Sequence, residues 1–299
     1  MPRYPESVES AINHYVRDME RRGGYSKLSV QAARKTTRNA FAIITKFQEG
    51  ALPRTVTSDT LRKALEYMKD NYAVSTQRTY FFYIREILKA SGNHAYDDIR
   101  IVYPTDIRPH VDWLTLDEAL TLIRAELPDA ETVIVSLALL HGLRRTEICN
   151  LNLTDIHGEE QYITVLGKGK GGGKFRSVHY HPTFHTTFER WMAYRTNLAH
   201  KCRDDSSDNA LLVYIKGGRL RRYSPDGLQH VVKRMSESVG IKFSLHTLRR
   251  TFGREMYHSG VRIETIARIM GHSSTEMTLR YIGINLDDQA QAMNQFILR

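Results

Sequence analysis

Cysteine is nearly absent from this 299-residue chain, which has only Cys149 and Cys202. Two cysteines cannot build a disulfide framework or a cysteine-rich metal cluster, so we expect a reducing, cytoplasmic setting. Long hydrophobic runs are also lacking, because the longest apolar stretch, at 132–140, is far shorter than the roughly 20 residues that span a bilayer. The opening MPRYPESVES has no apolar core, so neither a membrane anchor nor a signal peptide is expected.

Acidic residues are too few to balance the basic ones, since 33 Asp and Glu face 43 Lys and Arg for a net charge of +10. This excess favours a polyanionic partner, with nucleic acid ahead of a membrane surface, although a basic but otherwise ordinary enzyme is the alternative. Residues 1–92 hold 16 basic and 9 acidic residues, whereas 93–299 hold 27 and 24. The first third therefore carries most of the excess charge.

The periodicity of apolar residues divides the chain into two domains. In the first, residues 1–92, three- and four-residue spacing predicts four helices, over 8–23, 28–50, 57–72 and 75–92. Ser58 and Asp59 are the capping candidates of the third helix. Residues 93–113 contain Pro104 and Pro109 and break the helical period, which predicts a linker. The basic helical domain is expected to bind DNA.

The second domain, residues 114–299, is mixed. Thr115 and Glu118 form a capping-box pattern at the start of a helix, and an apolar helix follows over 131–142. Ile163 and Val165, then Val178 and Tyr180, are typical of short strands on either side of a glycine-rich basic turn, and helices are expected from there to the end. The predicted fold class is therefore mostly α with a small antiparallel β-sheet (α+β).

Four segments of the second domain carry residues suited to a reaction at phosphate: HGLRRTEI, LGKGKGGGKFR, LHTLRRTF and MGHSSTEMTLRYIG. Each is weak alone, but together they offer two arginines, two histidines, a lysine and a tyrosine. Arginine forks neutralise the charge that builds on phosphate oxygens, and lysine or histidine can protonate a leaving oxygen. A tyrosine phenolate can attack phosphorus and form a covalent adduct.

The last segment raises a geometric problem, because His272 and Tyr281 are nine residues apart. On one continuous helix that separation is about 900°, which would turn the two side chains to opposite sides. Gly271 provides a break, and Ser273 with Glu276 forms a capping-box pattern that predicts a new helix. The histidine would then lie in the turn and the tyrosine near the end of the next helix.

The four segments together resemble the signature of the tyrosine recombinase (phage integrase) family of site-specific DNA recombinases. That signature is an Arg in a Gly-Leu-Arg-x-x-Glu turn, a Lys in a β-hairpin, His-x-x-Arg, and Gly-His with a Tyr nine residues later. The matching residues are Arg144 with Glu147, Lys168, His246, Arg249, His272 and Tyr281. The resemblance is strong over 114–285 and only architectural over the first domain, where the family has a helical core-binding, SAM-like domain.

The resemblance implies a role for each cationic residue. Arg144 and Arg249 would clamp the scissile phosphate. His246 and His272 would hydrogen-bond the phosphate or assist proton transfer. Lys168 would protonate the 5′-oxygen leaving group.

The nucleophile implied by the resemblance is Tyr281, which would become linked to the 3′-phosphate. Strand exchange would then pass through a Holliday junction. Glu147 matches an acidic position expected to orient the phosphate site. No acidic cluster resembling a two-metal site accompanies these residues, so neither a metal nor another cofactor is expected.

The glycine-rich hairpin is about three residues longer than the family pattern Gly-Lys-Gly-x-Lys-x-Arg. Lys168 directly follows the predicted strand, but Lys170 would be the acid if the extra glycines precede the turn. A flexible basic loop that touches DNA backbone is the other interpretation. A nucleotide cradle is disfavoured, because the Gly-x-x-x-x-Gly-Lys-Ser/Thr form is missing. The DNA-binding candidates over the chain are Lys35, Arg38, Arg78, Arg85, Lys170, Lys174 and Arg176.

The C-terminal tail has an apolar face, made of Ile284, Leu286, Ala290, Met293, Ile297 and Leu298. It could dock on its own domain or, by the resemblance, be exchanged between neighbouring protomers of a dimer or tetramer on DNA. The expected partners are duplex DNA with specific recombination sites and further copies of this chain. Two other hypotheses stay open: a type IB topoisomerase and a DNA-binding protein without catalysis.

Overall fold

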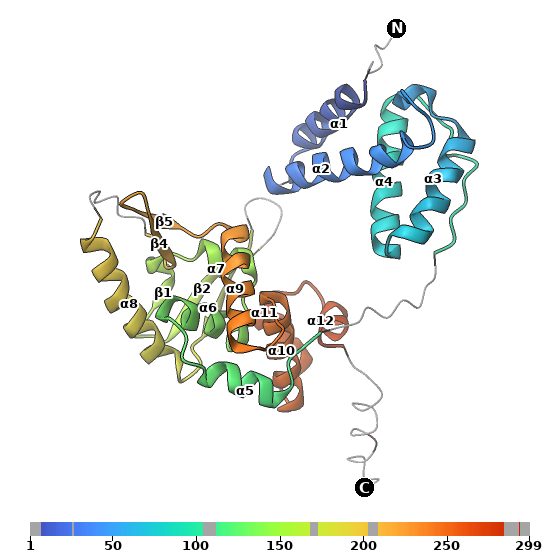
Figure 1. Cartoon of the computed structure of the whole chain (residues 1–299). Helices are drawn as coiled ribbons and strands as arrows, with labels where there is room; N and C mark the ends of the chain where they lie inside the picture. The colour runs from blue at the N-terminus through green and yellow to red at the C-terminus, as the bar shows by residue number, and fades with distance from the viewer. Residues whose placement is uncertain are drawn as a thin grey trace. The chain divides into compact units, whose positions relative to one another are not determined.

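The computed structural model describes residues 7–25, 27–103, 112–167, 173–202, 209–283 and 293, and it divides into two compact units (Figure 1). Unit 1 is residues 1–108 and unit 2 is residues 109–299, so the division falls within the predicted 93–113 linker. No helix in the described part of the chain is long and apolar enough to cross a membrane.

Unit 1 is helical and packs α2 against both α1 and α4 (Figure 1). Its core is built from the apolar faces of the four helices, with Ile12, Phe41, Leu61 and Ile84 almost fully buried. The elements are α1 (Val8–Arg22), α2 (Lys27–Ile44), a 3-10 turn (Pro53–Thr55), α3 (Ser58–Asn71) and α4 (Val74–Ala90). The helices predicted from apolar spacing are therefore present.

Two predicted boundaries in unit 1 are wrong. Helix α2 ends at Ile44 rather than at Gly50, because the chain turns at 45–50 and Gly50 adopts a positive φ of 64°. Helix α3 is capped by Thr57, whose side chain accepts from the backbone N–H of Thr60, rather than by Ser58. A row of neighbouring hydroxyl residues makes the sequence ambiguous by one position there.

The first residues of the predicted linker pack on unit 1. The side-chain amide of Asn93 is buried and donates to the carbonyls of Pro53 and Val56, both at 2.8 Å. The hydroxyl of Ser58 donates to the carbonyl of Ala95 at 2.8 Å. These buried polar contacts hold the segment after α4 against the helical core.

Unit 2 is built around α6, in which every residue from 133 to 139 is buried. Helix α6 packs against α8 and α10, which explains why its sequence is apolar on all sides. The predicted Thr115–Glu118 capping box is confirmed at the start of α5. The helices are α5 (Leu116–Arg124), α6 (Asp129–Leu139), α7 (Arg145–Asn150), α8 (Phe184–His200), α9 (Pro225–Val239), α10 (Leu245–His258), α11 (Ile263–Met270) and α12 (Thr275–Ile282), with a 3-10 turn at Leu153–Asp155.

Two small antiparallel sheets complete unit 2, and a mostly helical fold with little β-structure is confirmed. The strands are β1 (Ile156–His157), β2 (Tyr162–Leu166), β3 (Phe175–His179), β4 (Val213–Lys216) and β5 (Arg219–Arg222). β2 and β3 flank the glycine-rich turn as predicted, with Ile163 opposite Val178. The β4–β5 hairpin corrects the prediction that only helices follow β3.

Candidate active site

The first arginine of the site follows a turn that only glycine tolerates. Gly142 has a φ of 64°, and a Cβ there would lie 2.4 Å from the Cδ1 of Phe252 on α10. The carbonyl of Gly142 accepts from Nη1 of Arg249. The next residues, Leu143 and Arg144, lead into α7, so the turn brings Arg144 close to Arg249.

Glu147 is the buried counter-charge of the site, with its side chain 1% exposed. It accepts from the backbone N–H and Nη1 of Arg144, both at 2.8 Å, and from both terminal nitrogens of Arg176 at 2.9 Å. Burial alone would raise its pKa, but the hydrogen bonds and charge of Arg176, with those of Arg144, bring the pKa to about 2. Glu147 is therefore ionised at neutral pH.

Arg176 is part of this buried network. Beside its two bonds to Glu147, its Nε donates to the carbonyl of Ile269 at 2.7 Å. The guanidinium packs on Gly271, where a Cβ would lie 2.9 Å from Nη1. All three guanidinium nitrogens of Arg176 therefore bond to the protein, and the side chain joins β3 to α7 and to the end of α11. Its role as a DNA contact stays a prediction.

Arg249 lies on α10 and is 1% exposed. Its Nη2 donates to the carbonyl of Met270 at 2.6 Å and to Nε2 of His272 at 2.9 Å. Its Nε is buried without a hydrogen-bond partner in the described part of the chain. Burial, with the charge of Arg144, lowers the pKa of Arg249 to about 10, so it stays charged at neutral pH. A buried cation with an unused donor is suited to an anion.

Arg144 has N–H donors that are not used within the described part of the protein. Its Nη1 donates to Glu147 and its Nη2 to the carbonyl of Gly271, each at 2.8 Å. A guanidinium has five N–H donors, so about three remain for a ligand. The Arg144 side chain is 26% exposed, which leaves it open to solvent where Arg249 is not. Both arginines line one groove, Arg144 with the more exposed side chain.

Tyr281, His246 and His272 gather beside these arginines, as the sequence predicts for one site. The Tyr281 hydroxyl lies 3.0 Å from Nδ1 of His246, and the Tyr281 ring makes edge contacts with both histidine rings. Burial raises the pKa of Tyr281, while the charges of Arg249 and Arg250 partly offset this. Burial and the same arginines lower the pKa of His246, so its neutral form can accept the tyrosine proton.

The predicted break before the tyrosine helix is confirmed at Gly271, which ends α11 in the left-handed conformation. The cap of α12 is Ser274, whose hydroxyl accepts from the N–H of Met277, so the predicted Ser273–Glu276 box is wrong by one residue. The change of direction lets the His272 and Tyr281 rings approach to 5.1 Å between centroids. Figure 1 shows α10, α11 and α12 next to one another in unit 2.

Thr278 is a site residue that sequence reasoning missed. It is fully buried on α12, one turn before Tyr281, and its hydroxyl lies 2.9 Å from Nδ1 of His272. The same hydroxyl donates to the carbonyl of Ser274, which makes it an acceptor for an Nδ1–H of His272. Burial and the charge of Arg249 lower the pKa of His272 to about 4, so the ring is neutral and its Nε2 accepts from Arg249.

The lysine hairpin begins beside the same network. A Cβ on Gly167 would lie 3.5 Å from Nη1 of Arg176 and 3.7 Å from Oε1 of Glu147. Lys168 follows it directly, but Lys168 and Lys170 lie outside the described residues. Lys174 is described and exposed, just before β3.

The remaining DNA-binding candidates belong to unit 1 and are all exposed. Arg38 forms two hydrogen bonds with Glu9, and Arg78 stacks over Tyr103 at 4.9 Å from the ring centroid. Arg85 lies 6.0 Å from the ring centroid of Phe82. Lys35 is exposed on α2. Of the apolar tail face only Met293 is described, and it is 71% exposed.

An open groove of about 980 Å³ leads to the tyrosine. Arg144, Arg249, His246 and Tyr281 line one part of it, and one face of α9 lines another. Among the described residues no group of three or more His, Cys, Asp or Glu side chains is placed to hold a metal ion. The arrangement can bind an anion through arginines and present a tyrosine hydroxyl to it.

Comparison with known proteins shows which sequences and folds the chain is similar to. The sequence profile of the Phage integrase family matches residues 112–287. The chain is 29% identical over 221 residues to tyrosine recombinase XerC of Thermodesulfovibrio yellowstonii, covering 71% of this chain and 70% of that protein. It is 26% identical over 249 residues to tyrosine recombinase XerA of Pyrococcus horikoshii, covering 83% and 82% of the two chains.

Solved structures share the fold. The Tn1549 transposon integrase in complex with transposon right end DNA matches with a TM-score of 0.67 and 19% identity, over 96% of this chain and 99% of that chain. XerH recombinase bound to difH substrate matches with a TM-score of 0.66 and 14% identity, over 100% and 99%. At these identities the likeness concerns the fold alone.

Proposed function

Because the chain belongs to the phage integrase family, the tyrosine recombinases, we propose that it cleaves and rejoins duplex DNA at specific sites through a 3′-phosphotyrosyl intermediate and a Holliday junction. The observation that carries the proposal is the hydrogen-bond distance of 3.0 Å between the Tyr281 hydroxyl and Nδ1 of His246, whose lowered pKa favours the neutral ring. Two arginines with unused N–H donors lie beside this pair. Unit 1 is the proposed DNA-binding domain and unit 2 the catalytic domain.

In the proposed reaction the Tyr281 oxygen attacks the scissile phosphorus as its proton passes to His246. The bond from phosphorus to the 5′-oxygen breaks, and Lys168 protonates the leaving oxygen. Arg144 and Arg249 neutralise the charge that builds on the non-bridging oxygens. The new phosphotyrosyl ester keeps the energy of the broken linkage, so a 5′-hydroxyl from another strand can reverse the step without ATP.

Glu147 positions the arginines in this scheme rather than touching DNA. Its ionised, buried carboxylate holds Arg144 directly and is held in turn by Arg176. With one carboxylate for three nearby arginines, the site keeps a net positive charge toward the phosphate. We propose that several protomers act together on paired sites during strand exchange. The protomers would be joined by exchange of the C-terminal tail or by other contacts.

Covalent capture tests the proposal. The wild-type protein is incubated with random-sequence duplexes that carry one nick, since a nick close to the cleavage position lets the short fragment with the freed 5′-hydroxyl diffuse away and traps the adduct. We expect protein–DNA adducts that survive denaturation, a common sequence in the captured DNA, and a DNA-modified peptide that contains Tyr281. Attachment through another residue, or no capture by protein that binds the same duplexes, would contradict the mechanism.

The captured sequence then separates recombination from topoisomerase activity. A recombinase exchanges strands between two DNA molecules that carry the site, whereas a type IB topoisomerase relaxes a supercoiled plasmid without a partner site. We expect intermolecular exchange. Relaxation alone would favour the topoisomerase.

Thr278 is proposed as a positioning residue that fixes the tautomer of His272. Thr278→Val removes the hydroxyl at nearly constant volume, so His272 loses the acceptor for its Nδ1–H and no longer holds Nε2 toward Arg249. We expect adduct formation to slow about ten- to a hundredfold, equivalent to losing one buried hydrogen bond in the site. Nitrogen-15 NMR of the histidine rings should show a changed tautomer for His272.

Thr278→Ser is the matched control, because it keeps the hydroxyl and removes only a methyl group. We expect it to retain the His272 tautomer and most of the cleavage rate. Equal slowing in both variants would mean that packing, rather than the hydroxyl, matters at this position.

A further inference from the structure

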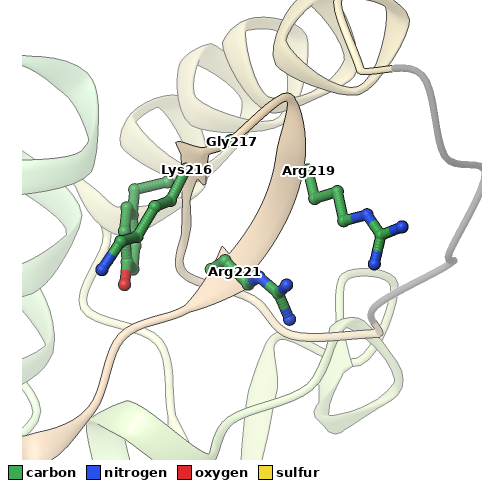
Figure 2. A pocket seen from close by; sticks show the side chains of 5 residues that line it. Lys216, Gly217, Arg219 and Arg221 are labelled. Carbon is green, nitrogen blue, oxygen red and sulfur yellow. The ribbon is translucent and has the colours of Figure 1, made fainter.

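The β4–β5 hairpin carries a one-sided cationic face outside the site described above. In the antiparallel register Lys216 lies opposite Arg219 and Tyr214 opposite Arg221. Side chains two residues apart on a strand share a face, so these four project together. Figure 2 shows Arg219 and Arg221 extending from one strand and Lys216 from the other, with Gly217 at the turn.

The opposite face of the hairpin anchors it to unit 2. Val213 and Leu220 are buried in the core. Arg222 donates to the carbonyls of Cys149 and Leu151 at 2.9 and 3.0 Å, at the C-terminal end of α7. The inner arginine is thus structural, and it fixes the outer cations on a rigid support joined to the helix that follows Arg144.

The outer cations lie close to one another on the hairpin. Lys216 faces Arg219 directly across the two strands, and like charges in that position repel. Lys216 and Arg221 form no ion pair with any acidic side chain in the described part of the chain. Tyr214 adds a partly exposed aromatic ring on the same face. A face with several cations attracts a polyanion.

The position of the hairpin relative to the groove indicates which polyanion would bind to it. β5 ends at Arg222 and α9 begins at Pro225. Residues of α9 from Asp226 to Glu237 line the groove that contains Tyr281, so one groove wall runs the length of this helix, about 20 Å. A duplex presents a phosphate charge about every 1.7 Å along its axis. A duplex that extends from Tyr281 along this groove wall would place phosphates near the hairpin end of α9.

We propose that the outer face of the β4–β5 hairpin, formed by Tyr214, Lys216, Arg219 and Arg221, is a second DNA-binding surface that holds the phosphate backbone away from the reacting phosphate. The identity of the polyanion rests on the proposed function. The contact is independent of sequence, because it is made to phosphates. It strengthens binding and does not take part in the chemical step.

A double variant, Lys216→Gln with Arg221→Gln, tests this surface in the full-length protein. Glutamine keeps most of each side-chain length and removes the charge. The probe is a fluorescein-labelled random-sequence duplex, titrated at several salt concentrations. We expect weaker binding and a plot of log affinity against log salt that is shallower by about 2, since each lost phosphate contact removes about 0.9 from the slope.

The matched control is Arg124→Gln with Arg262→Gln, which removes the same charge from exposed residues that line neither the hairpin face nor the groove. We expect this control to change the slope little. Both double variants should unfold at the wild-type temperature. Equal slopes for the hairpin variant and the control would overturn the proposal, and so would a hairpin variant that loses affinity for polyglutamate but not for duplex DNA.

A cleavage assay keeps this inference separate from the proposed function. At protein concentrations that saturate the nicked duplex, the hairpin variant should form the Tyr281 adduct at the wild-type rate. A slower rate at saturation would place the hairpin in the chemistry and overturn its role as a remote contact. If the wild-type protein formed no adduct at all, the proposed function would fail. The salt dependence of duplex binding would still show whether the hairpin binds DNA.

Discussion

Replacing Tyr281 by phenylalanine is expected to abolish the covalent protein–DNA adduct while leaving duplex binding close to the wild-type level. The substitution removes only the hydroxyl, which lies 3.0 Å from Nδ1 of His246. The ring remains to pack beside Phe252 and Met270 in the small core under α12. One hydrogen bond is lost, which costs about 1 kcal/mol of unfolding free energy, so the variant should stay folded. The measurement is adduct formation on the captured nicked duplex.

A matched control comes from a neighbouring tyrosine. Tyr257 lies on α10 in the same small core and is also partly buried. Tyr257→Phe removes an equivalent hydroxyl outside the group of Tyr281, His246 and His272, and it should form the adduct normally. An adduct that persists in Tyr281→Phe would show that another group attacks phosphorus. The assignment of His246 as the base would then also fail, because it depends on Tyr281 being the nucleophile.

Local patterns predicted much of this fold because the physics behind them is local. Helical apolar spacing located α1 to α4, and alternation around the glycine-rich turn located β2 and β3. Exact ends were less certain where hydroxyl residues are neighbours, as at Thr57 and Ser274. The β4–β5 hairpin was missed although Gly217-Gly218 between alternating residues is a typical two-residue turn signal.

The candidate site, like the fold, was predicted in part from local sequence patterns. A motif with fixed spacing indicated which residues would gather, and the structure brings Arg144, Arg249, His246, His272 and Tyr281 together. No local pattern could show that Arg176 bonds to a carboxylate 29 positions earlier, since that pair depends on how β3 packs against α7. The bond from Thr278 to His272 likewise exists only because the chain reverses at Gly271.

Arg144→Ala is expected to reduce the rate of adduct formation by at least roughly 10²–10³-fold, the usual effect of removing one donor that stabilises developing charge. Arg144 is the more exposed of the two arginines and keeps about three N–H groups available to a phosphate. Arg144→Lys should restore little, because an ammonium cannot bond to Glu147 and bridge two phosphate oxygens at once. The rate is measured in a single turnover with saturating protein.

The fold should survive this substitution, because Glu147 keeps both bonds from Arg176 and so is not left as an unpaired buried charge. Arg145→Ala is the matched control. Arg145 lies one position later, lines the same groove and bonds to Gln229 on α9 rather than to Glu147. If both variants unfold near the wild-type temperature and only Arg144→Ala loses cleavage, the loss belongs to charge stabilisation at the phosphate. Normal cleavage by Arg144→Ala would leave Arg249 as the sole clamp.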